Sequence, residues 1–226
     1  TNPERVRKAI APIEGCKEDW QITCEIARRM GVKGFDFESP KAIMEEVNLL
    51  APIYGGITYE RLEERGGLQW PCPTLDHPGT PFLHKGKFSR GLGKFFAIEF
   101  KEADELPDDE FSLVLTTGRI MWHYHTGSMT RRSAKLESEA PEAYIEINPK
   151  DAKEIGLNGH KHVRVTSRRG QIELAVRGTE HIRSGVVYIP FHWAEAPANA
   201  LTNNALDPVT KTPEYKVCAV KVEAIP

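Results

Sequence analysis

The chain has 226 residues, and 40% of them are hydrophobic, which is enough apolar side chain for one large or two small globular domains. Its 30 Lys and Arg are balanced by 32 Asp and Glu, so nucleic acid is not indicated as a partner. No stretch approaches the roughly 18 consecutive apolar residues that a membrane-spanning helix needs. The chain begins at Thr1 without Met and without a signal-peptide core, so we expect a soluble protein, or a piece of one.

The cysteines are scattered along the chain, with no CxxC pair that would indicate zinc or an iron–sulfur cluster. Such thiols are typical of a reducing compartment, so we expect a cytoplasmic location, with the periplasm as the alternative. His123 and His125 could supply two metal ligands. In an extended segment, however, they would share one face and merely line a ligand, so no metal site is predicted.

The first third of the chain predicts three helices. One covers residues 19–30, with Gly31 as its stop. A second begins at Pro40, with Ser39 as its N-cap, and runs to about residue 46. A third begins near Thr58. We expect these helices to pack against a larger body.

Residues 66–106 are crowded with Gly and Pro and show little periodicity, and only Lys94 to Phe100 is typical of a strand. The segment is too apolar for a flexible linker. We therefore expect an ordered connection pressed onto other parts of the molecule. Its large apolar side chains include Trp70, Phe82, Leu83, Phe88, Phe95 and Phe96.

After Pro107 the pattern predicts mainly strands, and residues 107–226 are predicted to form a second domain after a helical and loop-rich segment at 1–106. A short helix capped by Asn148 should end at Gly156, before a tight turn at Asn158 and Gly159. At least six strands with few helices favour a closed or nearly closed barrel. The strands are expected at Phe111–Leu115, Tyr144–Ile147, a hairpin from Val163 to Val176 that turns at Arg169-Gly170, Val186–Pro190 and Val217–Val222.

The loop from Thr116 to Ser133 follows the first of these strands. No Asp or Glu occurs between Glu110 and Glu137, whereas six basic or imidazole side chains fall inside that interval: Arg119, His123, His125, Arg131, Arg132 and Lys135. Its Thr, Ser and Gly residues add hydroxyls and unobstructed backbone N–H groups, which are the donors that a phosphate needs. The loop is therefore predicted to bind an anion.

Several motifs, in order, resemble the C-terminal part of prokaryotic molybdopterin oxidoreductases, and most of all the catalytic α subunit of molybdenum or tungsten formate dehydrogenases. They are TGRIMWHYHTGSMTRR, INPKDAKEIGLNG, VTSRRGQI, PFHWAEAPANALTNNALDP and TPEYKVCAVKV. GGLQWPCP and HPGTPFLH extend the likeness upstream, so it covers nearly the whole chain.

The resemblance implies a double-psi β-barrel, preceded by the tail of a larger α/β domain, that clamps the guanine-nucleotide arms of two molybdopterin guanine dinucleotides. Within the matching set, Gly118 permits close backbone approach, Arg119 can fork onto a phosphate and Asn199 can read a guanine edge or a pterin. The implied cofactor-binding residues are Thr117, Gly118, Arg119, Ile120, Met121, Trp122, His123, Tyr124, His125, Thr126, Asn199 and Lys216.

The resemblance places Phe191, and His192 beside it, toward the substrate side, but no catalytic residue is implied in this chain. A hydrogen-bonded structural imidazole is the alternative role for His192. The family's iron–sulfur motif, its Cys or selenocysteine metal ligand and the adjacent His and Arg have no counterpart in the sequence. We therefore expect a C-terminal fragment, inactive alone. The 4Fe–4S cluster and the Mo or W ligand would lie in the remainder of the subunit, with electron-transfer subunits as partners and formate or CO2 as substrate.

Other interpretations stay open at this point. A nitrate reductase of the same superfamily shares the TGR, HTG and PEYK motifs, and a stand-alone barrel could serve as an interaction or assembly module. Trp122 and Trp193 are more typical of a core than of a cofactor wall. Arg168 and Arg169 fit solvated hairpin charges as well as ligand contacts, and Asn203 and Asn204 fit turn formers.

Overall fold

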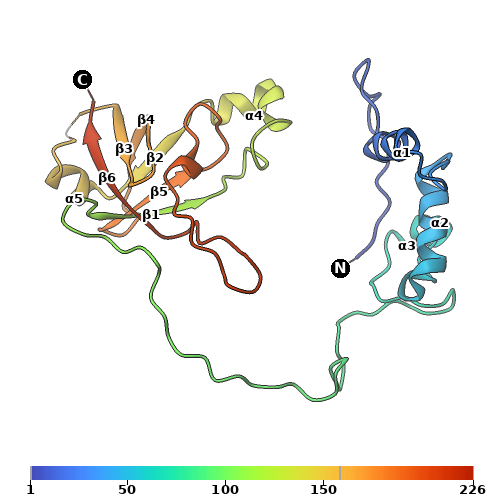
Figure 1. Ribbon diagram of the computed structural model, residues 1–226. Helices are drawn as coiled ribbons and strands as arrows, with labels where there is room; N and C mark the ends of the chain where they lie inside the picture. The colour runs from blue at the N-terminus through green and yellow to red at the C-terminus, as the bar shows by residue number, and fades with distance from the viewer. Residues whose placement is uncertain (1, 158, 226) are drawn as a thin grey trace. The chain divides into compact units, whose positions relative to one another are not determined.

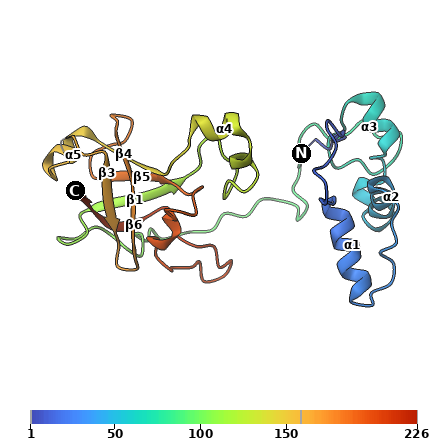
Figure 2. The same cartoon turned by 90° about the horizontal axis from the view of Figure 1, so that it is seen from above.

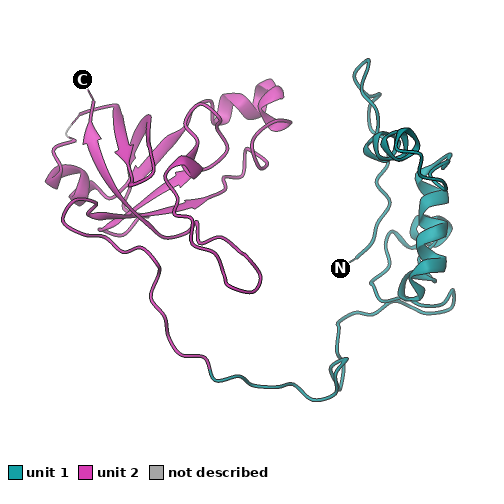
Figure 3. Ribbon diagram, viewed as in Figure 1, with its two compact units in different colours: residues 1–97 teal, residues 98–226 magenta. Residues whose placement is uncertain are grey.

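The computed structural model describes residues 2–157 and 159–225, and it divides the chain into two compact units, Thr1–Ala97 and Ile98–Pro226 (Figure 3). Each unit is considered by itself. The predicted turn at Asn158 includes a residue that lies outside the described part of the chain. The domain assignment of residues 1–106 and 107–226 stays a prediction.

The first unit contains the three expected helices, α1 (Asp19–Arg29), α2 (Pro40–Leu50) and α3 (Tyr59–Arg65), with the short 3-10 turn η1 (Pro52–Tyr54) after α2 (Figure 1). The predicted Ser39 cap is confirmed, because its side chain accepts a hydrogen bond from the Ala42 amide in the first turn of α2. The Thr58 side chain caps α3 in the same way, by accepting from the Arg61 amide. α2 is a turn longer than predicted. A small core joins Ile57, Leu62, Leu68 and Cys72.

The predicted strand from Lys94 to Phe100 is wrong, because the structure shows no strand there. The expectation that the large apolar residues of this segment are pressed onto other parts of the molecule is also wrong for most of them. Trp70 packs partly against the small core, but Phe82, Leu83, Phe88, Phe95 and Phe96 are exposed. A strand needs a hydrogen-bonding partner along its edge, and no described residue provides one for this segment.

The second unit is a closed barrel, as predicted (Figure 2). Its order around the barrel is β1-β5-β2-β4-β3-β6, with bounds β1 (Leu113–Gly118), β2 (Tyr144–Ile147), β3 (His162–Thr166), β4 (Gln171–Gly178), β5 (Val186–Pro190) and β6 (Cys218–Ala224). The pairs β1–β5 and β2–β4 are parallel and the other pairs are antiparallel. This is the mixed topology expected of a double-psi barrel.

Alternation of apolar and polar residues explains the barrel wall. In the hairpin of β3 and β4, Val163, Val165, Ile172 and Leu174 are buried, whereas their neighbours in sequence point outward. The wall encloses a core to which every strand contributes. The predicted cap of the short helix α5 (Pro149–Glu154) is confirmed, since the Asn148 side chain accepts from Lys150 N–H at 3.0 Å. β1 starts two residues later than predicted and extends to Gly118.

Shorter elements cover the ends of the barrel. They are the 3-10 turn η2 (Thr130–Arg132) and helix α4 (Ala134–Glu139), both between β1 and β2, and the 3-10 turn η3 (Ala198–Ala200) between β5 and β6. None of these was predicted as an element. Each is too short for a periodic sequence pattern to reveal it.

Candidate functional site

The candidate site lies where two parallel strands end side by side. β1 pairs with β5 so that Thr117 is opposite Ile189 and Gly118 is opposite Pro190. The pairing continues one step further, because Phe191 N–H donates to Gly118 O at 3.2 Å. The chain therefore leaves both strands at the same edge of the barrel, and the loop after β1 meets the PFH segment after β5.

A tyrosine fixes the start of the loop. Tyr188, on β5, donates its hydroxyl to Arg119 O at 2.8 Å. Its ring lies so close to Gly118 that a Cβ there would be 2.6 Å from Tyr188 Cε2. Burial raises the pKa of Tyr188 to about 12, so the phenol remains a donor at neutral pH. Gly118 is thus required by a neighbouring side chain of the barrel itself.

His192 ties the two ends of the loop together. Its Nε2 accepts from Ile120 N–H at 3.0 Å, and its Nδ1–H donates to His125 O. The side chain is fully buried. Desolvation lowers its pKa, with the nearby His123 and Arg119 acting in the same direction, so the neutral tautomer that makes both bonds is favoured. The alternative role of a structural imidazole, rather than a group facing substrate, is the one that these contacts support.

His123 is a second buried histidine that stabilises the loop through hydrogen bonds, and it does not line a ligand site. It is 4% exposed, and its Nε2–H donates to Ala140 O at 2.8 Å. With Nε2 carrying the proton, Nδ1 accepts from the Thr130 hydroxyl at 3.2 Å, and the same hydroxyl accepts from Tyr124 N–H at 3.1 Å. Both ring nitrogens of His123 are occupied, whereas His125 is exposed and adopts a left-handed conformation with φ 48°.

Arg131 balances the acidic residues near the loop. Its guanidinium contacts Glu137 at 3.1 Å and Glu195 at 2.8 Å. Its aliphatic stem lies against Gly127, where a Cβ would be 2.6 Å from Arg131 Cδ. These ion pairs lower the pKa of Glu195. Arg131 is therefore occupied by contacts within the barrel unit. Because it neutralises Glu137 and Glu195, these two acids do not cancel the positive charge of the other basic residues in the loop.

The donors left for a ligand lie in one stretch of the loop, residues 119–126. Arg119 is exposed, with its guanidinium 5.5 Å from the centre of the Phe191 ring, and it makes no ion pair with any described residue. The N–H groups of Met121, Trp122, His125 and Thr126 donate to no other group within residues 2–157 and 159–225. An exposed guanidinium, free amides and the exposed Thr126 and His125 side chains are donors of the kind that an anion needs.

Of two predicted residues from the C-terminal part of the chain, Lys216 contacts the start of the loop. Lys216 Nζ donates to Thr117 O at 2.5 Å, so its ammonium lies next to the start of the loop. Asn199 is exposed on η3. Thr117, however, is 2% exposed and donates its hydroxyl to Tyr215 O at 2.8 Å. The expectation that this hydroxyl donates to a phosphate is therefore wrong, because it already fastens the segment that carries Lys216.

The remaining predicted residues divide between surface and core. Met121 and Tyr124 are exposed, whereas Ile120 and Trp122 pack partly against the barrel core. Trp193 is buried in that core, as expected. Asn203 is the expected structural residue, since its amide donates to Val217 O at 2.8 Å and accepts from Ala205 N–H at 3.0 Å.

The sequence did not indicate Tyr188, the contact of the Thr130 hydroxyl with His123, or the internal pairing of Arg131. Thr130 was predicted only as one of the hydroxyl donors for an anion. Tyr188 lies on the outward-facing register of β5, and only the parallel pairing with β1 brings it to Gly118. The partners of Arg131 come from positions 6 and 64 residues away. No local pattern in the sequence signals such contacts. Among the described residues, no group of three or more His, Cys, Asp or Glu is placed to hold a metal ion.

A closed six-stranded barrel with a donor-rich loop at the end of one parallel strand pair defines the class of protein. The family model described as molydopterin dinucleotide binding domain matches residues 113–219, from the start of β1 into β6. The resemblance inferred from the motifs is thereby confirmed.

Two curated relatives indicate the wider family. The chain is 50% identical over 225 residues to the F420-dependent formate dehydrogenase 2 subunit alpha of Methanococcus maripaludis, covering 98% of this chain and 33% of the relative. It is 39% identical over 229 residues to the assimilatory nitrate reductase catalytic subunit of Bacillus subtilis, covering 96% of this chain and 32% of the relative. The chain therefore spans about a third of the length of these relatives.

A solved structure supports the fold. Acetylene hydratase from Pelobacter acetylenicus superposes with a TM-score of 0.64 at 14% sequence identity, over 97% of this chain and 34% of the hydratase. No helix within the described ranges is long and apolar enough to cross a membrane.

Proposed function

We propose that this chain is the cofactor-binding portion of a formate dehydrogenase catalytic subunit, and that it holds the guanine dinucleotide arms of two molybdopterin cofactors. The observation that carries the proposal is the group of unpaired donors at the loop, with the Arg119 guanidinium beside the free amides of residues 121–126. Phosphates need charge-assisted donors from several directions. The family model that matches the barrel supports a dinucleotide as the anion.

Each proposed contact has a distinct task. Arg119 donates two hydrogen bonds to a phosphate, and further donors to the same group are the free amides of Met121, Trp122, His125 and Thr126. Lys216 adds a point charge beside Thr117, and Asn199 supplies both a donor and an acceptor toward a base or a pterin. Gly118, Ile120, His123 and Tyr124 contribute the backbone shape of the loop. Phe191 supports Arg119 through its ring face, at 5.5 Å.

When bound, the cofactor supplies the metal and the electron pathway for two-electron oxidation of formate to CO2, or for the reverse reaction. The residues of this chain bind and orient it, which is the usual contribution of a protein to cofactor chemistry. We propose that the Mo or W ligand and a 4Fe–4S cluster belong to the rest of the subunit, that this chain alone is inactive, and that the complex is cytoplasmic. The name of the formate dehydrogenase relative makes F420 the electron carrier to test first.

Formate is favoured over nitrate because identity to the formate dehydrogenase relative is 50%, against 39% to the nitrate reductase relative. Fold and cofactor binding do not fix the reaction. The intact complex should therefore be assayed with both substrates. Formate oxidation without nitrate reduction is expected, and the opposite result would contradict this assignment.

The binding role is tested by Arg119→Ala and Lys216→Ala in the intact protein, with guanine nucleotide released by acid measured per polypeptide. A charge-assisted contact to phosphate is worth about 1.5–3 kcal/mol, so each variant should lose cofactor roughly tenfold to a hundredfold faster than the parent. Arg183→Ala is the matched control, because Arg183 is exposed and has no ion-pair partner in the described ranges. Unchanged retention in both test variants would refute the role.

A further inference from the structure

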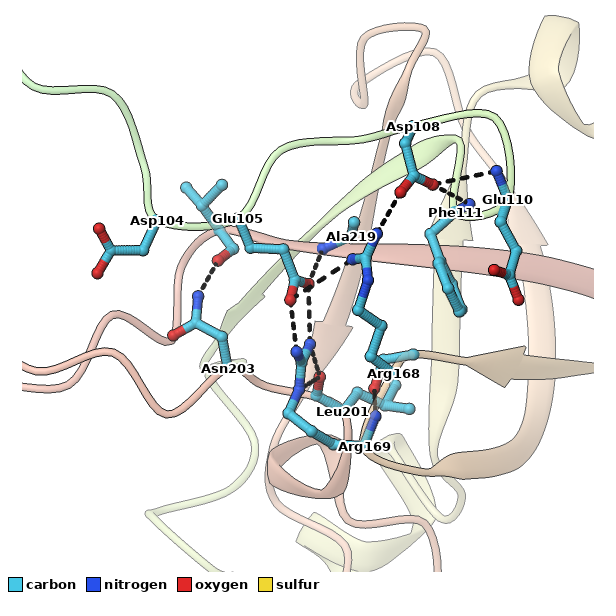
Figure 4. A network of polar contacts seen from close by, with 12 residues as sticks. Asp104, Glu105, Asp108, Glu110, Phe111, Arg168, Arg169, Leu201, Asn203 and Ala219 are labelled. Carbon is cyan, nitrogen blue, oxygen red and sulfur yellow. Dashed lines mark hydrogen bonds and ion pairs between the residues drawn. The ribbon is translucent and has the colours of Figure 1, made fainter.

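Arg169 and Glu105 form an ion pair that is largely shielded from solvent (Figure 4). Arg169, at the turn between β3 and β4, contacts Glu105 through two nitrogens, with Nη1 at 2.5 Å from Oε2 and Nη2 at 2.8 Å from Oε1. The Glu105 side chain is only 13% exposed. Arg169 holds the pKa of Glu105 below its usual range, so this carboxyl is charged at neutral pH.

Arg169 also holds the turn that carries Asn199. Its Nε and Nη2 donate to Leu201 O at 3.1 and 2.8 Å, directly after η3. Leu201 is fully buried, so this carbonyl is attached to a fixed point of the core. The backbones of the hairpin turn and η3 also approach each other closely, because a Cβ on Gly170 would be 2.9 Å from Ala200 O. The hairpin turn and η3 therefore have little freedom to separate.

Glu105 holds the segment that carries Lys216. The carboxylate accepts from Ala219 N–H at 2.6 Å, at the beginning of β6 and three residues after Lys216. One guanidinium is therefore linked to the backbone near Asn199 directly, and to the backbone near Lys216 through one carboxylate. Figure 4 shows Glu105 between Ala219 and Arg169.

The neighbouring Arg168 serves a different purpose. It pairs with Asp108, lies 4.7 Å above the Phe111 ring and reaches Glu105 Oε2 at 3.6 Å, so all of its contacts are with the segment before β1 and none is with the backbone near Asn199. Its side chain is 38% exposed, against 26% for Arg169. The interpretation as a solvated hairpin charge therefore fits Arg168 better than Arg169, which donates both to Leu201 O and to the Glu105 carboxylate.

We propose that Arg169 and Glu105 form a positioning pair that fixes Asn199 and Lys216 relative to each other for dinucleotide binding. The inference rests on the proposed function, because it assigns the pair to that same site. Neither side chain need touch the cofactor. Loss of the pair should loosen residues 198–204 and 215–219 together, although they are far apart in sequence, and should weaken cofactor retention as a consequence.

The test uses the intact protein with Arg169→Ala, and it measures amide hydrogen exchange together with guanine nucleotide content. Arg164→Ala is the matched control, since Arg164 pairs with Glu173 on the same hairpin at 2.7 Å but contacts neither segment of the site. Arg169→Ala should speed exchange at 198–204 and 215–219 by at least about tenfold and lower the nucleotide content, with β2 and β4 still protected. Arg164→Ala should change neither quantity.

Glu105→Gln is the second variant, in case Arg169→Ala does not fold. The amide oxygen can still accept from Ala219 N–H, and Arg169 can still donate to Leu201 O, but the ion pair that joins the two segments is lost. Exchange should therefore rise at both segments, by less than in Arg169→Ala. Exchange in Arg169→Ala or Glu105→Gln that matches Arg164→Ala at both segments would overturn the proposal. If exchange rises as expected while Asn199→Ala and Lys216→Ala retain cofactor normally, the positioning pair stands and the binding role of those two residues is wrong.

Discussion

His192→Phe tests the most specific structural claim about the loop. The substitution keeps a ring of similar size in a fully buried position, so the cost of a cavity is small. It removes the acceptor for Ile120 N–H and the donor to His125 O. Each neutral hydrogen bond contributes about 0.5–1.5 kcal/mol, and together they predict a loss of about 1–3 kcal/mol of unfolding free energy. Ile120 is half-buried and His125 exposed, so water offsets part of this loss.

The pH dependence supplies a second, independent measure. Burial lowers the pKa of His192 in the folded protein below its unfolded value of 6.5, so the unfolded state binds the proton more readily. The contribution of this residue is therefore fully present above the unfolded pKa. It decreases as the pH falls from 6.5 toward the lower folded pKa, because a protonated Nε2 would present a donor to the Ile120 N–H. The ionisable groups acting on the ring are His123, Arg119 and His125.

The assay is denaturant unfolding of the intact protein between about pH 7.5 and pH 5, with hydrogen exchange at residues 119–126. His162→Phe is the control, because His162 is exposed at the start of β3. His192→Phe should unfold more easily and show a shallower decline of stability below pH 6.5. The reasoning is refuted if His192→Phe and His162→Phe behave alike, or if the parent's decline below pH 6.5 persists unchanged in His192→Phe.

Two further predictions concern close packing and acid stability. Gly118→Ala should destabilise the protein by about 1–3 kcal/mol, because the added Cβ meets the Tyr188 ring. Gly178→Ala on β4 is the control, and it should change stability little because the space around Gly178 is open. Thermal melting of both variants measures the difference, and equal effects would contradict the prediction. The pKa of Glu105 lies below its ordinary value of 4.5, so its contribution is complete above pH 4.5 and is lost as the pH falls through the lower folded pKa. In Arg169→Ala, the free energy of unfolding should therefore fall less steeply with decreasing pH below 4.5 than in the parent protein. An unchanged pH dependence in this range would count against the pair.

The barrel could be predicted from the sequence because each strand has a recognisable pattern of apolar and polar residues over a few adjacent positions. The alternation of Val163 and Val165 with polar neighbours, and the Asn148-Pro149 cap, depend on a few adjacent residues. Lys94–Phe100 shows the limit of the same approach. Its composition suits a strand, but a strand forms only where a partner edge is available, and composition carries no information about the partner.

The sequence indicates where the candidate site lies, but it does not indicate which residues of the loop face outward and which are buried. The absence of acids between Glu110 and Glu137 marks the loop correctly as the donor-rich segment. Which of its residues face outward depends on long-range contacts. His123 and Thr117 are turned inward by partners at Ala140 and Tyr215, at sequence separations of 17 and 98 residues. Residue type alone gives His123 and His125 the same prediction, although the structure buries one and exposes the other.

The charge of the site follows from how the arginines are paired, not from their number. Arg131 neutralises Glu137 and Glu195 beside the loop, and Arg169 neutralises Glu105, which contacts the backbone at the start of β6. These pairs remove the acids that would otherwise repel an anion, so Arg119 can act with its full charge although the chain as a whole carries a net charge of -2. An arginine that contacts no ligand can thus raise affinity for one. Replacing Arg131 should therefore weaken anion binding through two unpaired carboxylates, even though its guanidinium is occupied inside the barrel unit.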